Sequence, residues 1–142
     1  MVSGAALYHF GVSGGAESGV LEIRNTGSGR LYARWPLEDS SRFDVEFTHS
    51  VSQSPVRESF KAEDEKLRLE SVRFYSYGAG LGGLGPGQTL SRDGDAMIIS
   101  GFGVLLREFN VIVSDHVLFI NNEIIDLRER FGKNAQITIQ YR

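Results

Sequence analysis

The sequence predicts an all-β fold, namely a single-domain antiparallel β-sandwich or barrel of about nine to ten short strands with a glycine-rich loop. From Gly19 onward, short runs that alternate apolar and polar residues recur about every ten residues, with turn-forming residues between them. The chain has 17 glycines against 3 prolines, which suits many tight turns. The apolar spacing of a helix is almost absent, so sheets must supply the core.

The length of the chain indicates one domain, because 142 residues can enclose a core but are few for two domains. Residues 1–18 are rich in glycine, alanine and serine. We expect them to be a flexible lead-in, or the remainder of a removed upstream segment, before a single all-β domain at residues 19–142. The sequence shows no signal peptide or membrane anchor, and as written it predicts a soluble chain.

The composition excludes several classes of site. Fifteen basic and eighteen acidic side chains give a formal net charge of −3. No stretch concentrates lysine or arginine, which argues against nucleic acid as a partner. The chain has no cysteine, so disulfides, thiolate metal sites and cysteine nucleophiles are excluded.

The first predicted hairpin joins residues 20–24 to residues 30–35 through a loop rich in glycine and serine. Pro36 should end this hairpin, because proline donates no hydrogen bond to a sheet. Alternation predicts an inward-facing set formed by Leu21, Ile23, Leu31, Ala33 and Trp35.

The second predicted hairpin joins residues 43–51 to residues 56–60 and carries two ionisable side chains on its apolar face. Alternation places His49 and Glu58 among phenylalanine and valine residues. A four-residue loop at 52–55 sets His49 directly opposite Glu58. The hairpin therefore predicts a contact between an imidazole and a carboxylate.

Several further strands and turns follow. Residues 67–75 form a strand whose apolar phase changes, which predicts a β-bulge near Glu70 or Ser71. Residues 104–113 form either a strand pair or one long bent strand. The other expected elements are hairpins at 97–100 after an Asp-Gly turn and at 116–120 with 124–127, a helical turn at 126–131 capped by Asp126, and a final strand at 135–141.

The expected contact between His49 and Glu58 has two interpretations. A polarised imidazole at the base of a ligand pocket would make the pair part of a binding site. A buried cross-strand pair that fixes the register of the hairpin would make it structural. The residues alone leave both interpretations open.

His116 offers a metal-dependent alternative. It lies in a predicted strand, in phase with Leu118 and Ile120. If the sheet brings it near His49 and Glu58, two imidazoles and a carboxylate match an open catalytic zinc site or a non-haem iron site. The spacing forms no local metal-binding motif, so a structural histidine is the competing interpretation.

The glycine-rich loop at 77–87 contains a formal G-x-G-x-x-G match at residues 78–83. A dinucleotide site needs a helix directly after this motif, whereas Leu-Gly-Pro-Gly follows here, so the nucleotide interpretation is excluded. The loop can still bring backbone amides close to a ligand. Gly78, Ala79 and Gly80 are therefore candidate binding residues, and a plain connecting loop is the alternative.

Four short segments carry a family resemblance: residues 47–51, residues 55–58, residues 77–81 and residues 115–118. In this order they resemble the bacterial family known as domain of unknown function 1850, over about residues 20–142. Members of that family are small proteins, usually with an amino-terminal signal or anchor, and are often encoded beside TRAP transporters of the TAXI type. The resemblance implies an extracytoplasmic location, in the cell envelope or periplasm, and an association with transport. It implies no catalytic residue.

We therefore expect a non-enzymatic, envelope-associated β-module that is accessory to a TRAP-type solute transporter and binds a transporter component or a small acidic solute. We expect no cofactor, no nucleic acid and no membrane insertion. A metal-dependent hydrolase and a structural scaffold without a ligand are the alternatives. The candidate binding residues are His49, Glu58, Gly78, Ala79, Gly80 and His116.

Overall fold

The computed structural model of the protein describes residues 18–75 and 84–142. The described elements are β1 (Ser18–Asn25), β2 (Leu31–Glu38), β3 (Arg42–Thr48), β4 (Pro55–Glu63), β5 (Lys66–Phe74), β6 (Thr89–Asp93), β7 (Ala96–Leu106), β8 (Glu108–Ile112), β9 (Val117–Ile120), β10 (Glu123–Asp126), α2 (Leu127–Phe131) and β11 (Gln136–Tyr141).

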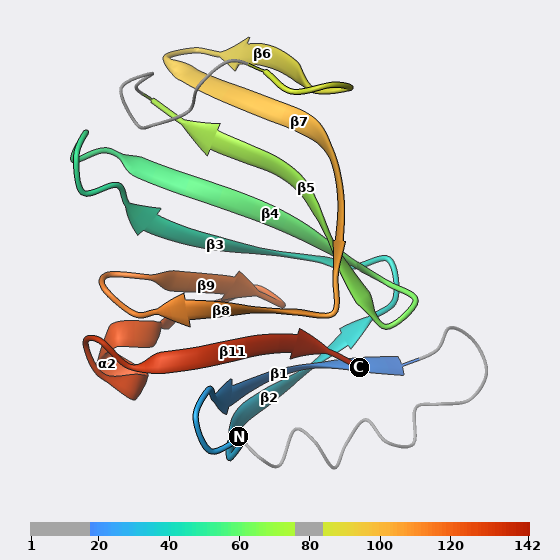
Figure 1. The fold of residues 1–142 in the computed structure, drawn as a ribbon, viewed down its shortest axis with the longest axis vertical. Helices are drawn as coiled ribbons and strands as arrows, with labels where there is room; N and C mark the ends of the chain where they lie inside the picture. The colour runs from blue at the N-terminus through green and yellow to red at the C-terminus, as the bar shows by residue number, and fades with distance from the viewer. Residues whose placement is uncertain (1–17, 76–83) are drawn as a thin grey trace.

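The strands form two antiparallel sheets (Figure 1). Four strands make the small sheet, in the order β2-β1-β11-β8, and seven make the large sheet, in the order β10-β9-β3-β4-β5-β7-β6. The predicted all-β fold is confirmed, in its sandwich form. The described residues hold 11 strands, slightly more than the sequence indicated.

The small sheet corrects two details of the first hairpin. β2 does not end at Pro36, which pairs with Val20 while β2 runs on to Glu38. Because β2 lies at the edge of its sheet, the missing N–H of the proline costs no hydrogen bond between strands. Leu31, expected to face inward, is exposed. A register shift beside Ile23 puts Leu31 out of phase with the inward-facing residues Ala33 and Trp35 of the same strand.

The large sheet contains the predicted bulge and a strongly bent strand. The register between β4 and β5 shifts at Glu70, where sequence alternation changes phase. β7 pairs with both β5 and β6 and bends along its length (Figure 1), and it carries Gly101 and Gly103 at positive φ. Past Leu106 the chain crosses to the small sheet as β8. Residues 104–113 are therefore neither one long bent strand nor two strands that pair with each other, because they divide between β7 in the large sheet and β8 in the small sheet.

The carboxyl-terminal elements agree with the sequence prediction. The turn between β9 and β10 places Asn121 and Asn122 at positive φ, as tight hairpins require. Asp126 caps α2 by accepting a hydrogen bond from the amide of Glu129, and Gly132 follows the helix. No helix in the described part of the chain has the length and apolar character needed to cross a membrane.

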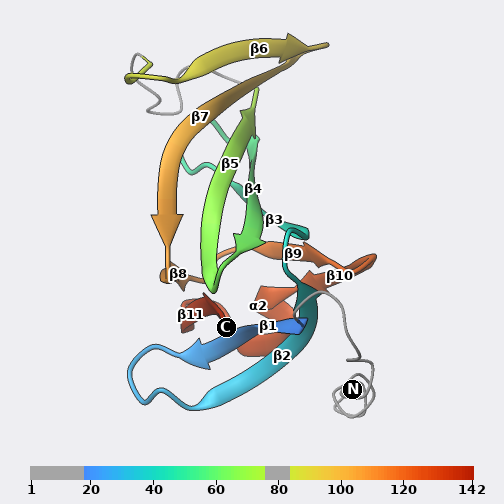
Figure 2. The ribbon, with the colours of Figure 1, turned by 90° about the vertical axis from the view of Figure 1, so that its right-hand side faces the viewer.

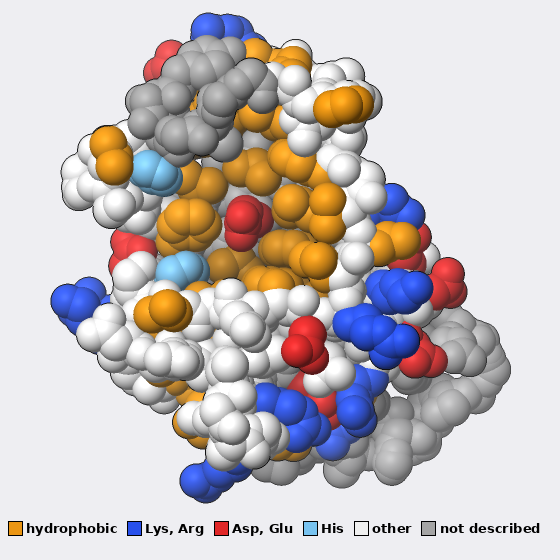
Figure 3. Space-filling view, in the orientation of Figure 1, with side chains coloured by type: hydrophobic (Ala, Val, Ile, Leu, Met, Phe, Trp, Pro, Cys, Tyr) orange, Lys and Arg blue, Asp and Glu red, His pale blue; other side chains and the backbone are white. Residues whose placement is uncertain are grey.

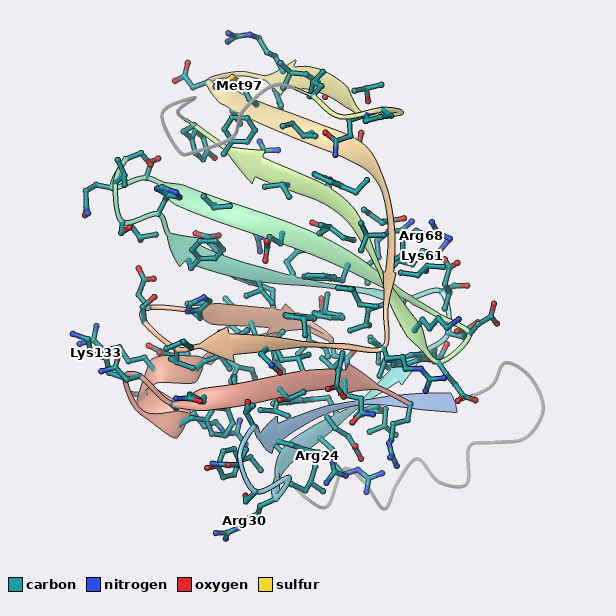
Figure 4. The ribbon with its side chains drawn as sticks, in the orientation of Figure 1. Arg24, Arg30, Lys61, Arg68, Met97 and Lys133 are labelled. Atoms are coloured by element: carbon teal, nitrogen blue, oxygen red, sulfur yellow. The ribbon has the colours of Figure 1, made fainter. Side chains whose placement is uncertain are left out.

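The two sheets differ in extent, and this difference positions the candidate site. The main core lies between the sheets and includes Leu21, Trp35 and Ile139. The upper parts of β5 and β7, together with β6, rise beyond the small sheet (Figure 2). A second apolar cluster lies on the large sheet, with Met97 near its upper end (Figure 4), and contains Val56, Val72, Phe74, Met97 and Ile99.

Gly101 should be far less tolerant of substitution than Gly103, although both residues have positive φ in β7. A Cβ atom at Gly101 would overlap the carbonyl oxygen of Gly87, whereas a Cβ atom at Gly103 meets nothing within 4 Å. We expect Gly101→Ala to lower the free energy of unfolding by about 3 kcal/mol and Gly103→Ala by about 1 kcal/mol. Urea denaturation measures both values, and equal losses would contradict this packing.

Candidate functional site

The hairpin between β3 and β4 keeps the predicted faces but not the predicted register. Val45, and not His49, lies opposite Glu58. The loop occupies residues 50–53, since the backbone amide of His49 donates to the carbonyl of Ser54 (2.9 Å). His49 lies four residues beyond Val45, a distance of roughly 13 Å along a strand. The predicted contact between His49 and Glu58 is therefore wrong.

The cause of the error is the position of the turn. Gln53 adopts a left-handed φ of 56° inside the loop. Pro55, assigned to the loop by the sequence analysis, instead begins β4 and pairs with Thr48. The register differs from the prediction by an even number of residues, so His49 and Glu58 stay on the same face of the sheet.

His49 has a local structural role at the hairpin tip. Its Nδ1 atom accepts hydrogen bonds from the backbone amides of Val51 (3.2 Å) and Ser52 (3.5 Å). These bonds satisfy amides that the turn leaves without strand partners. The side chain of His49 thus stabilises its own loop.

Glu58 lies on the apolar inner face of the large sheet, between Val45 of β3 and Val72 of β5. It borders a cavity of about 350 Å³, called here the Glu58 cavity. Figure 3 shows an open hydrophobic hollow with an acidic side chain near its centre and histidine at its edge. The residues lining the Glu58 cavity are Val45, Phe47, Glu58, Phe60, Leu69, Leu106, Phe109, Asn110, Val111, Ile112 and His116.

The carboxylate of Glu58 has no ion-pair or hydrogen-bond partner within the described residues. Desolvation by the surrounding apolar side chains raises its pKa above the usual value of a glutamate. A half-buried carboxylate without a cation is destabilising in its charged form. The Glu58 cavity therefore presents a group that gains from a proton or from a positively charged ligand.

His116 borders the same cavity and directly precedes β9. Its ring stacks on Phe47, with centroids 5.1 Å apart, and its Nδ1 atom accepts from the amide of Ser114 (3.1 Å). Burial lowers the pKa of His116, and the charge of Asp115 only partly opposes this effect. The neutral imidazole consequently carries its hydrogen on Nε2 and can act as a donor.

Asp115 joins the His116 segment to the end of β3, because its Oδ1 atom accepts from the backbone amide of Thr48 (3.0 Å). Partial burial alone would raise the pKa of Asp115. Hydrogen bonds from Thr48 and Ser114 outweigh that effect and lower it. The ionised carboxylate therefore helps to position His116 beside Phe47.

The structure brings only part of the predicted site together. Glu58 and His116 border one cavity, whereas His49 caps a turn outside it. Gly78, Ala79 and Gly80 lie outside the described residues. Within residues 18–75 and 84–142, no group of three histidine, cysteine, aspartate or glutamate side chains is placed to hold a metal ion. The metal-dependent alternative using His49, Glu58 and His116 thus lacks structural support.

Alternation placed Phe47 and Phe60 on the same face as Glu58, but the sequence did not indicate the contributions of the other sheet to the Glu58 cavity. Phe109 and Asn110 reach the cavity from β8 in the other sheet, and no local pattern indicates that approach. The Oδ1 atom of Asn110 accepts from Thr138 (2.8 Å), which leaves its amide hydrogens as donors.

Comparison with known proteins identifies a family. The model described as Domain of unknown function (DUF1850) matches residues 43–127, a range that contains both Glu58 and His116. No curated protein and no solved structure matches the chain significantly.

Substitution of Glu58 by glutamine should change the pH dependence of stability. The folded protein holds the proton of Glu58 more tightly than the unfolded chain does. In the unfolded chain the side-chain carboxyl has the ordinary glutamate pKa of 4.5. Wild-type stability therefore falls as the pH rises through the raised pKa, and Glu58→Gln lacks this fall. As the pH rises from acid to alkaline, the free energy of unfolding of Glu58→Gln should increase relative to that of the wild type. The expected increase is about 1.4 kcal/mol for each pH unit by which burial raises the pKa of Glu58.

Urea denaturation of both proteins across that pH range measures the difference. Exposed Glu123 supplies a matched control, and Glu123→Gln should show no comparable pH-dependent gain. A constant difference between Glu58→Gln and wild type at all pH values would show that Glu58 keeps its ordinary pKa.

Proposed function

We propose that the chain, which belongs to the DUF1850 family, is a non-enzymatic binding protein that holds a small, largely apolar ligand in the Glu58 cavity. The observation that carries this proposal is an open apolar hollow with an unpartnered carboxylate near its centre (Figure 3). Ligand sites in proteins typically combine apolar walls with a few polar groups that orient the ligand.

The size and walls of the Glu58 cavity suit a small molecule. Its volume of about 350 Å³ falls at the lower end of the range for ligand pockets. Phe47, Leu69, Leu106 and Phe109 on its walls are only partly buried, so a ligand would remove apolar surface from water. The donors of His116 and Asn110 and the carboxylate of Glu58 supply polar contacts.

The lining residues favour binding over catalysis. No serine, threonine, lysine or tyrosine is among the described residues that border the cavity. The hydroxyl of Ser114 lies 3.4 Å from Nδ1 of His116, but Ser114 is not among the lining residues. Glu58 and His116 can orient a ligand without either group being activated by the other.

The charge in the cavity also distinguishes the two ligands expected from the sequence, a transporter component and a small acidic solute. An acidic solute would meet the carboxylate of Glu58, with no lysine or arginine among the described lining residues to compensate its charge. A small apolar ligand, or the apolar surface of a transporter component, avoids this repulsion. We therefore favour these occupants over a small acidic solute.

The family resemblance supports an extracytoplasmic role beside a TRAP-type transporter, and we include this setting in the proposal. The chain should co-purify with the subunits of a TRAP-type transporter when they are co-expressed and extracted in mild detergent. Failure to co-purify would remove the transport association and leave ligand binding untouched.

Binding in the cavity should be detected with N-phenyl-1-naphthylamine, a neutral fluorophore that brightens in apolar surroundings. We expect a saturable rise in fluorescence with the wild-type protein. Ile112→Arg places a charge at the cavity and should weaken binding at least about fivefold, which corresponds to roughly 1 kcal/mol.

Ile124→Arg is the matched control, because Ile112 and Ile124 are similarly exposed (65% and 71%) and Ile124 lies on β10 outside the cavity. His49→Ala is a second control at the hairpin tip. Both controls should bind the fluorophore as the wild type does. The absence of saturable binding, or equal binding by Ile112→Arg and wild type, would contradict the proposed function.

A further inference from the structure

We infer that the ligand of the Glu58 cavity is a hydrophobic amine, whose protonated nitrogen pairs with the carboxylate of Glu58 while its apolar body contacts the aromatic walls. This inference rests on the proposed function, since it names the chemical class of the ligand for the same cavity. Three observations carry it: the sign of the charge in the cavity, the lack of a protein counter-charge, and the aromatic lining.

The first observation concerns charge within the cavity. Glu58 is the sole acidic side chain among the described lining residues, and neither lysine nor arginine accompanies it. His116 is neutral at physiological pH because burial lowers its pKa. When Glu58 is ionised, the interior of the cavity has a negative potential, which favours a cationic ligand over a neutral or anionic one.

The second observation concerns Arg57 and Arg73, the basic residues beside Glu58 on β4 and β5, which have acidic partners away from the cavity. Arg57 precedes Glu58 in β4 and therefore points to the opposite face, where its Nε atom lies 3.0 Å from Asp44. The Arg57 guanidinium also lies 3.9 Å from the centre of the Phe119 ring. Arg73 of β5 pairs with Asp93 at 2.8 Å.

Other basic side chains lie at the periphery of the molecule. Figure 4 places the five labelled ones at the outer ends of the sheets and in turns, namely Arg24, Arg30, Lys61, Arg68 and Lys133. Arg68 pairs there with Glu63 at 3.0 Å. No lysine or arginine lies among the described lining residues, so a counter-charge for the ionised carboxylate of Glu58 can come from a ligand.

The third observation concerns the aromatic walls. Phe60 and Phe109 stack with their ring centroids 4.6 Å apart, and Phe47 stacks on His116. These rings border the same cavity as Glu58. Aromatic faces attract cations through their quadrupole, and they also pack against apolar groups. A protonated amine on an apolar chain or ring can both interact with the aromatic faces as a cation and pack against them. An alcohol on the same chain or ring can only pack against them.

Proton linkage follows from the same geometry. Desolvation raises the pKa of Glu58 in the free protein, and an ammonium group beside the carboxylate would lower it again. Binding of an amine should therefore release a proton from Glu58 and tighten as the pH rises through the raised pKa. Asp44, Glu46 and Arg73 lie on the opposite face of β3 and β5, and His116 is the other titratable side chain among the described lining residues.

Calorimetry with three ligands that share one skeleton tests the inference: 3-phenylpropylamine, 3-phenylpropan-1-ol and 3-phenylpropionate. At a mildly alkaline pH the wild-type protein should bind the amine at least about tenfold more tightly than the alcohol, and the acid most weakly. In Glu58→Gln the preference for the amine over the alcohol should disappear. Glu123→Gln, at an exposed position outside the cavity, should keep the wild-type preference.

The outcomes separate this inference from the proposed function. Binding of the alcohol or the acid as tight as that of the amine overturns the amine assignment and leaves a small-ligand site in place. A preference for the amine that survives in Glu58→Gln also overturns the assignment, because another group would then hold the nitrogen. If none of the three ligands binds, the amine assignment is overturned as well. Binding of the neutral fluorophore then shows independently whether the cavity holds a ligand.

Discussion

The small sheet covers only part of the apolar inner face of the large sheet, and the candidate site depends on this mismatch. Where the sheets overlap, residues such as Leu21 and Ile139 are fully buried and form the main core. Beyond the overlap, β5 and β7 present a second apolar cluster. The Glu58 cavity lies where residues of both sheets approach each other, so an inner surface of the sandwich remains accessible.

Glu58 is costly for the fold in the position that makes it useful for binding. A carboxylate among Val45, Val72 and Phe60 loses hydration without gaining a partner from the described residues. A purely structural residue at this site would be apolar, since an apolar side chain of similar volume would pack without that loss. His49 differs, because both of its hydrogen bonds serve its own turn. One ionisable residue of the hairpin thus supports the fold, and the other faces the cavity.

Local sequence patterns predicted the faces of strands better than their partners. Alternation identified Leu21, Ile23 and Trp35 as buried, and the phase change at Glu70 identified the bulge, because both features depend on neighbouring residues. The hairpin register failed because a loop at 50–53 and a loop at 52–55 satisfy the same alternation. The Glu58 cavity combines β3, β4, β5, β7 and β8 with His116, and such long-range packing leaves no periodic signal.

The proposed binding site depends on an unpartnered carboxylate that lies on the open apolar face of the large sheet. Carbon-13 NMR titration of the Glu58 side-chain carboxyl, assigned by its loss in Glu58→Gln, measures the pKa of this group. We expect a pKa above the ordinary glutamate value in the free protein and a downward shift of that pKa on saturation with 3-phenylpropylamine. An ordinary pKa that does not respond to the amine would contradict the proposed site.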